Sequence, residues 1–297
     1  MRVALFTRTD LAESDPMRLR VVSTLGTLGV DLVTEEAAIA AAAGAVAPGT
    51  STTGTSATGP SAPGFIDAVV VLGGDGTLLR AVQHVLREDT PVLGVNLGSL
   101  GFLTEITTEE VDEALKTLVS GRYPFSWRSL LSATLVHENE SHVHQGLNDV
   151  TIAKAATVSR IVEFTVSVGD KFVSDFRADG LIVSSPTGST AYNLAAGGPI
   201  LHPSLDAVVL TPICPHMLSN RPLVIPASAP VRIRVRSSSS PVHVTVDGQW
   251  SREVTPADEL VIRKGIRRLK LVTSASRDYY EVLRTKLKWG EAPKLRT

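Results

Sequence analysis

A glycine-rich stretch with a single carboxylate follows an apolar run early in the chain. Residues 73–77 read Gly-Gly-Asp-Gly-Thr, the run 68–72 before them is apolar, and residues 77–86 have the apolar spacing of a helix. A glycine-rich turn between a strand and a helix points backbone N–H groups at an anion. The stretch therefore predicts a phosphate site in which Asp75 holds a metal or takes a proton. The alternative is a plain turn in which Asp75 caps the helix.

A second stretch that could bind a ligand lies further along the chain. Residues 177–199 gather charged, hydroxyl and glycine residues around the apolar run 181–183. The hydroxyl and backbone N–H groups of residues 185–190 suit a phosphate or a ribose. Asp179 can accept hydrogen bonds from ribose hydroxyls or an adenine amino group, and Tyr192 offers an aromatic face and a phenol. A turn-rich connection between strands is the alternative.

The elements that position the first stretch alternate between strands and helices. Strands are predicted at residues 1–6, 30–33, 68–72 and 91–96. Helices are predicted at residues 19–28, 77–86 and 109–119. This βαβ order predicts a parallel sheet of the Rossmann-like kind. The glycines of residues 97–102 follow a strand directly, at the sheet edge where ligands bind in open α/β folds.

The pattern changes after Pro124 to short runs of alternating apolar and polar residues. Strands are predicted at residues 131–136, 150–152, 163–168, 171–175, 231–236 and 242–246. Such runs between closely spaced turns indicate antiparallel sheets. We therefore expect an α/β domain over residues 1–125, an all-β domain over residues 126–274, and a C-terminal helix within residues 275–297 that packs on the α/β domain.

The segment 37–66 has no charged residue, and most of residues 47–64 are Thr, Ser, Gly, Pro and Ala. The alanine-rich residues 37–45 can continue a helix. A segment of the composition of 47–64 cannot bury enough apolar surface to offset its ordering entropy. We expect a flexible surface insertion, with a lid over the active site as the alternative.

Composition excludes several classes of protein. The formal net charge of the 297 residues is −1, so no overall field favours nucleic acid or an anionic membrane. The single cysteine, Cys214, fits a reducing cytosol and lacks the base that a thiol nucleophile needs. No apolar run is long enough to span a bilayer. The expectation is a cytoplasmic protein with neither a nucleic acid nor a membrane as its partner.

Other familiar sites are missing from the sequence. It has neither the P-loop motif nor the complete Gly-x-Gly-x-x-Gly dinucleotide motif. His137, His142 and His144 lie near a polar hairpin tip without a cysteine or carboxylate in ligand spacing, which argues against a metal site there.

Together the motifs resemble the NAD kinase family, which comprises ATP-NAD kinases and inorganic polyphosphate/ATP-NAD kinases. The similar stretches occur in the family's order at residues 73–77, 96–102, 148–149, 177–199, 215–222, 247–249 and 285–289. The first stretch alone is weakly specific, because diacylglycerol and sphingosine kinases and 6-phosphofructokinases have something similar. The second stretch is much more specific.

The resemblance implies phosphorylation of the adenosine 2′-hydroxyl of NAD⁺ by ATP with a divalent metal, Mg²⁺ or Mn²⁺, to give NADP⁺. Phosphoryl transfer needs positioning, charge stabilisation and a base near the attacking hydroxyl. Asp75 is then that base, or the group that orients the hydroxyl. The phosphate-binding residues expected around it are Gly73, Gly74, Gly76, Thr77 and Arg80, although a solvated helix face would also account for Arg80.

The resemblance also implies the dinucleotide contacts of the all-β domain. These are Asn148, Asp149, Asp179, Thr190, Ala191, Tyr192, Asn193, Leu194, Ala195 and Gln249, with Arg160 and Arg177 as cations suited to phosphate. For Asn148 and Asp149 a structural turn is the alternative. Family members are usually dimers or tetramers, so a homodimer or homotetramer is implied.

The chain departs from the family pattern at two positions. Ala195 stands where the family commonly has serine, so a hydroxyl contact is missing. Arg177, rather than glycine, resembles the ATP-dependent members that prefer NAD⁺ over NADH. A diacylglycerol-type lipid kinase and a non-catalytic NADP(H)-binding protein are the competing functions.

Overall fold

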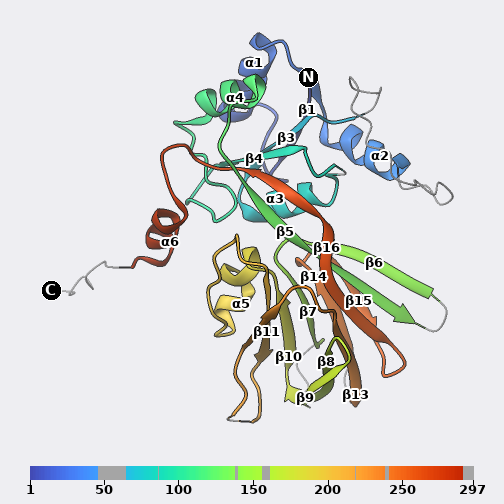
Figure 1. The fold of residues 1–297 in the computed structure, drawn as a ribbon. Coiled ribbons are helices and arrows are strands. Elements are labelled where there is room, and N and C mark those ends of the chain that lie inside the picture. The colour runs from blue at the N-terminus through green and yellow to red at the C-terminus, as the bar shows by residue number, and fades with distance from the viewer. Residues whose placement is uncertain are drawn as a thin grey trace. The chain divides into compact units, whose positions relative to one another are not determined.

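The computed structural model describes residues 1–45, 65–85, 87–137, 140–155, 161–217, 219–237 and 241–289. The chain forms two compact units (Figure 1). The first unit comprises Met1–Ser126 and Leu269–Thr297, and the second comprises Trp127–Arg268. The chain crosses from one unit to the other within β5 (Phe125–His137) and returns within β16 (Glu259–Val272).

The first unit is built on a parallel sheet with the strand order β2-β1-β3-β4-β16. Its other strands are β1 (Arg2–Thr7), β2 (Asp31–Val33), β3 (Ala68–Gly73) and β4 (Pro91–Asn96). Every residue of β3 and β4 is buried, as expected for interior strands of a parallel sheet. Gly73 pairs with Asn96, so the carboxyl ends of β3 and β4 lie at the same edge.

The described part of the first unit also contains helices. They are α1 (Pro16–Thr27), α2 (Glu35–Ala45), α3 (Asp75–Val82), α4 (Val111–Ser120) and α6 (Tyr279–Leu287). Leu25 of α1 and Leu115 of α4 are fully buried in one apolar cluster with Val70 and Leu93 of the sheet. α6 begins with a capping box, in which Asp278 and Glu281 exchange hydrogen bonds between side chain and backbone.

The second unit consists mainly of two antiparallel sheets. One has the order β12-β11-β10-β7-β14-β15; in the other β16, β13, β8 and β9 are neighbours, and β5 pairs with β16 and β6. The strands are β6 (Glu140–Gly146), β7 (Asp149–Lys154), β8 (Val162–Val168), β9 (Lys171–Ala178), β10 (Gly180–Ser184), β11 (Ala207–Ile213), β12 (Leu223–Pro226), β13 (Val231–Ser237), β14 (Val242–Val246) and β15 (Trp250–Val254). Two short helices, η1 (Thr187–Thr190) and α5 (Tyr192–Ala195), follow β10.

Side chains from both sheets of the second unit share one apolar core. Val150 and Val183 come from the first sheet, and Phe164 and Ile233 come from the second. The alternation of β13 predicts its orientation correctly, because Val231, Ile233 and Val235 are buried while the arginines between them are more exposed.

The predicted fold class, an α/β domain followed by a largely β domain with a C-terminal helix, is confirmed. The sequence predicts that residues 269–274 lie in the all-β domain. In the structure they belong to the first unit, where Lys270, Leu271 and Val272 pair with β4. Residues 47–64 of the charge-free segment lie outside the described residues. None of the described helices is long and apolar enough to cross a membrane.

Candidate active site

The carboxylate of Asp75 is held by the loop that follows β4. Its Oδ1 accepts hydrogen bonds from the backbone N–H groups of Leu103 (3.1 Å) and Thr104 (3.0 Å), and from the Thr104 hydroxyl (2.9 Å). Its Oδ2 accepts one from the backbone N–H of Phe102, at 2.9 Å. A carboxylate oxygen has about two acceptor positions. Oδ2 is therefore the oxygen with room for another donor.

This geometry contradicts the helix-cap alternative for Asp75. The N-cap of α3 is Gly74, whose carbonyl accepts hydrogen bonds from the N–H groups of Thr77 and Leu78. Asp75 is the first helical residue, and its described hydrogen bonds come from the 102–104 loop rather than from its own helix. Asp75 lies half-buried beside an exposed Gly76.

Thr104 connects Asp75 to the end of β4. It is fully buried, and its hydroxyl also accepts a hydrogen bond from the Asn96 amide at 2.9 Å. The Gly98 N–H donates to the side-chain oxygen Oδ1 of Asn96 at 2.7 Å. A Cβ at Gly101 would lie 2.1 Å from Asp75 Oδ1, so only glycine permits this approach. The two glycine-bearing strand ends predicted from the sequence thus meet at one carboxylate.

A cavity of about 380 Å³ lies within the second unit, in the size range of small-molecule sites. It is lined by Asn148, Asp149, Thr151, Ala191, Tyr192, Thr245, Asp247 and Gly248. Four of these residues, Asn148, Asp149, Ala191 and Tyr192, are predicted dinucleotide contacts. Tyr192 lines this cavity and is about half exposed, so its aromatic side chain is available for stacking on a flat ligand.

Asp247 holds the backbone of the residues that line this cavity. Its carboxylate accepts hydrogen bonds from the N–H groups of Leu147 (2.6 Å), Asn148 (2.8 Å) and Asp149 (3.0 Å). Burial raises the pKa of Asp247, against the lowering effect of these three donors. Burial also raises the pKa of Asp149, to about 6, and the nearby Asp247 charge adds to the effect.

Both parts of the chain match known families. The ATP-NAD kinase N-terminal domain matches residues 3–123, and the ATP-NAD kinase C-terminal domain matches residues 147–274. The chain belongs to the NAD kinase family.

Curated relatives agree with this assignment. The NAD kinase of Geotalea daltonii is 50% identical over 227 residues, covering 76% of this chain and 79% of the relative. The NAD kinase of Syntrophotalea carbinolica is 48% identical over 230 residues, covering 77% of this chain and 80% of the relative.

Solved structures of the family have the same fold. Yeast NADH kinase complexed with NADH superposes with a TM-score of 0.81 at 26% identity, covering 100% of this chain and 90% of that chain. An NAD kinase from Archaeoglobus fulgidus in complex with ATP superposes with a TM-score of 0.74 at 23% identity, covering 96% of this chain and 99% of that chain, a likeness that shows the fold alone.

As a member of this family the chain is an ATP-dependent NAD kinase, and its substrates are NAD⁺ and ATP. The reaction transfers a phosphoryl group from ATP to the adenosine 2′-hydroxyl of NAD⁺ and gives NADP⁺. The alternative of a diacylglycerol-type lipid kinase finds no support in these matches.

Some predicted contacts of this NAD kinase have internal partners instead of lining the cavity. Asn193 is fully buried; its amide nitrogen donates to the carbonyls of Ser189 and Pro199, and its oxygen accepts from the Thr211 hydroxyl at 2.6 Å. The Thr190 hydroxyl donates to the Thr187 carbonyl.

Charged residues of the second stretch form ion pairs within the second unit. Asp179 pairs with Lys154 at 2.7 Å, and Arg177 pairs with Glu163 at 3.1 Å. Ala195 and Gln249 are exposed and Leu194 is half-buried, and none of the three lines the cavity. Arg160 lies outside the described residues.

Arg80 in the first unit also has partners within the protein. Its guanidinium pairs with Glu35 of α2 at 3.0 Å and donates to the Thr7 carbonyl of β1 at 2.6 Å. The described contacts of Arg80 are therefore structural, and its phosphate role stays a prediction.

Residues 185–188 hold the backbone of Leu147 and Asn148, next to the cavity. The Ser185 hydroxyl donates to the Leu147 carbonyl at 2.6 Å, and the Ser185 N–H donates to the Asn148 carbonyl at 2.9 Å. A Cβ at Gly188 would lie 2.1 Å from the Asn148 carbonyl oxygen, so this segment needs glycine to pack there. The sequence predicted hydroxyls for phosphate or ribose, whereas the structure uses Ser185 to fix Asn148.

The sequence did not single out Thr151, Thr245, Asp247 or Gly248 as site residues. The family resemblance does include residues 247–249, and this stretch could have identified Asp247 and Gly248 as site residues. Thr151 and Thr245 pair directly across β7 and β14. No motif marks them.

Proposed function

We propose that Asp75 accepts the proton of the adenosine 2′-hydroxyl while that oxygen attacks the γ-phosphorus of ATP. The new O–P bond forms as the bond from the γ-phosphorus to the bridging oxygen breaks, and ADP leaves. The observation that carries the proposal is the fixed carboxylate, with three donors on Oδ1 and one on Oδ2. This arrangement leaves Oδ2 as the proton acceptor and fixes its direction.

Phosphate binding is assigned to residues 73–77, which run from the end of β3 into the first turn of α3. Gly73, Gly74 and Gly76 add no side chain, and the backbone N–H groups at the start of α3 suit an anion. Thr77 is buried in the same turn. The turn therefore supplies charge stabilisation, which accounts for most of the catalysis in phosphoryl transfer.

The adenosine of NAD⁺ is assigned to the cavity of the second unit. Asn148 and Asp149 offer hydrogen-bonding groups for ribose hydroxyls or the adenine amino group, and Tyr192 offers a face for stacking. Asp179, Thr190, Asn193, Leu194, Ala195, Gln249, Arg160 and Arg177 remain predicted dinucleotide contacts.

A divalent metal, Mg²⁺ or Mn²⁺, completes the proposal. Among the residues that the structure describes, no group of three or more His, Cys, Asp or Glu side chains could hold a metal ion. Mg²⁺ commonly binds through substrate phosphates with one or two carboxylates and water. Such an ion is held mainly by substrate phosphates and water, and needs no protein cage. When bound, the metal neutralises phosphate charge.

A cytoplasmic location and a homo-oligomeric assembly are also proposed. The single cysteine fits the cytoplasm. The homodimer or homotetramer comes from the family resemblance, and sedimentation velocity tests it.

The function is tested with purified protein, NAD⁺ and MgATP, with NADP⁺ read out by an NADP-specific dehydrogenase. NADP⁺ is the expected product, and its absence would contradict the proposed activity. Replacing NAD⁺ with NADH, or ATP with polyphosphate, tests the preference that Arg177 suggests.

The cavity is tested separately by titrating NAD⁺ into Tyr192→Ala. The matched control is Phe172→Ala, another exposed aromatic residue of the second unit that does not line the cavity. We expect Tyr192→Ala to weaken binding by about tenfold, whereas the control binds as wild type does. Equal binding by both variants would place the adenosine elsewhere.

A further inference from the structure

The loop that binds Asp75, residues 102–104, continues into Glu105, which forms hydrogen bonds with the segment that follows β16. Glu105 comes directly after Thr104 and is almost fully buried. Its carbonyl accepts a hydrogen bond from Arg277 at 2.7 Å, and its carboxylate accepts one from the Ser274 N–H at 3.2 Å. Both the backbone and the side chain of Glu105 are therefore fixed from outside the loop.

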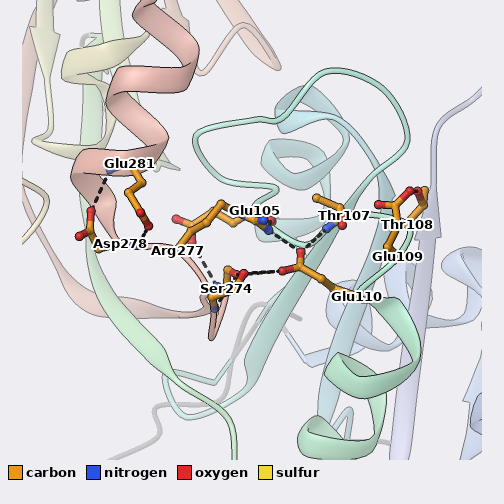
Figure 2. A network of polar contacts seen from close by, with 10 residues as sticks. Glu105, Thr107, Thr108, Glu109, Glu110, Ser274, Arg277, Asp278 and Glu281 are labelled. Atoms are coloured by element: carbon orange, nitrogen blue, oxygen red, sulfur yellow. Dashed lines mark hydrogen bonds and ion pairs between the residues drawn. The ribbon is translucent and has the colours of Figure 1, made fainter. Parts of the chain in front are cut away.

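Glu110 closes the same network at the start of α4 (Figure 2). Its carboxylate forms an ion pair with Arg277 and accepts hydrogen bonds from the Ser276 hydroxyl (2.6 Å) and the Thr107 N–H (3.0 Å). Burial alone would raise the pKa of Glu110, but the hydrogen bonds from Ser276 and Thr107, with the Arg277 charge, lower it to about 2. Glu110 is therefore ionised at physiological pH.

One nitrogen of Arg277 joins the two halves of the network. The same guanidinium nitrogen donates to the Glu105 carbonyl and to the Glu110 carboxylate. The next residue, Ile106, is fixed by the sheet, because it forms a bridge with Val95 of β4. The chain is therefore anchored directly after residues 102–104.

A second contact reaches the loop from α6. Lys286 lies over the ring of Phe102, with its nitrogen 5.8 Å from the ring centroid. Phe102 is the residue whose N–H donates to Asp75 Oδ2. The C-terminal segment thus contacts the loop at both ends of the run that binds the carboxylate.

We propose that Arg277 is a positioning residue for Asp75. By fixing Glu105 it holds the N–H groups of Leu103 and Thr104 where they donate to Oδ1, and so keeps Oδ2 available to the substrate hydroxyl. This inference rests on the proposed role of Asp75. Without Arg277 the loop samples positions in which the carboxylate turns, and a small misplacement of a catalytic group is costly.

Arg277→Met tests the proposal, with Arg2→Met as the matched control. Arg2 also joins an acid and a backbone carbonyl in the first unit, through Asp31 (3.2 Å) and Phe65 (3.4 Å), but has no described contact with the loop. We expect Arg277→Met to lower kcat about tenfold and to leave KM for both substrates within about twofold. Arg277→Lys should restore most of kcat, because one ammonium can donate to both acceptors.

Hydrogen exchange at the amides of residues 102–104 gives a readout that does not depend on activity. We expect faster exchange in Arg277→Met than in wild type and in Arg2→Met. Ser276→Ala removes one hydrogen bond to Glu110 and should also make the amides of residues 102–104 exchange faster. This variant replaces Arg277→Met in the test if Arg277→Met does not fold. Unchanged exchange, or a kcat equal to that of the control, would overturn the proposal.

The two proposals can fail separately. If Asp75 is not the catalytic residue, Asp75→Asn keeps its turnover while the exchange result for Arg277→Met still stands. If Arg277 does not position the loop, Asp75→Asn loses turnover while exchange in Arg277→Met stays at the wild-type rate.

Discussion

Asp75 and Thr104 are joined by two hydrogen bonds, from the Thr104 N–H at 3.0 Å and from its hydroxyl at 2.9 Å, and both reach Oδ1. The hydroxyl is also the acceptor for the Asn96 amide. Thr104 therefore supplies two of the three donors on Oδ1 and ties that oxygen to the end of β4.

Thr104→Val removes the hydroxyl and keeps the shape of the side chain. The buried Asn96 amide then lacks its acceptor, and the free energy of unfolding should fall by about 1–3 kcal/mol. Because Oδ1 loses one of its three donors, we expect kcat to fall severalfold with little change in KM. Thr104→Ser keeps the hydroxyl and is the control. Denaturant unfolding and steady-state kinetics measure both effects, and equal kinetics for the two variants would show that the hydroxyl does not act on Asp75.

Asp247→Asn tests the support of the cavity. The amide replaces one acceptor oxygen with a donor that faces backbone N–H groups of residues 147–149, so NAD⁺ binding should weaken by about tenfold. Calorimetric titration of NAD⁺ measures the change. The matched control is Asp170→Asn, at an exposed hairpin turn between β8 and β9. Equal binding by the two variants would contradict the role given to Asp247.

The pH dependence of the free energy of unfolding tests the raised pKa of Asp149. Its pKa is raised from 3.8 to about 6, so between these values the folded state holds a proton that the unfolded state has released. The contribution of Asp149 to the free energy of unfolding therefore falls as pH rises from 4 to 6, by up to about 3 kcal/mol. Asp149→Asn should flatten this fall in urea titrations across that range. An unchanged slope would show that Asp149 does not bind this proton.

Arg80→Met and Glu35→Gln distinguish two roles of Arg80. If Arg80 is structural, both variants lose the same ion pair and should be destabilised alike, by about 1 kcal/mol. Their kcat values should then equal that of wild type. Loss of kcat in Arg80→Met alone would assign Arg80 to phosphate binding instead.

The sequence predicts the strand, the turn and the helix around Asp75 because their signals are local. An apolar strand, a glycine-rich turn and a helical pattern adjoin one another at Asp75. The partners of Asp75 carry no such signal, since Thr104 reaches it only because the chain returns along β4 at Ile106. Asp247 reaches Leu147 across 100 positions of the chain, which no spacing rule predicts.

Other elements were missed for physical reasons that the structure makes plain. β16 contains Arg263, Lys264, Arg267 and Arg268, so its apolar alternation is broken, and only its pairing partners make it a strand. Ser185 has the chemistry to bind phosphate, but burial directs its hydroxyl to the Leu147 carbonyl. A hydroxyl in a turn can serve a ligand or the backbone, and sequence does not decide between them.

The most direct test of the account compares Asp75→Asn with wild type in two measurements on the same preparation, NADP⁺ formation from NAD⁺ and MgATP, and the dissociation constant of NAD⁺. We expect kcat to fall by about a thousandfold or more, because the proton acceptor at Oδ2 is replaced by an amide. The dissociation constant should stay within about threefold of wild type, since the cavity residues are unchanged. Turnover by Asp75→Asn at a rate close to that of wild type would contradict the account.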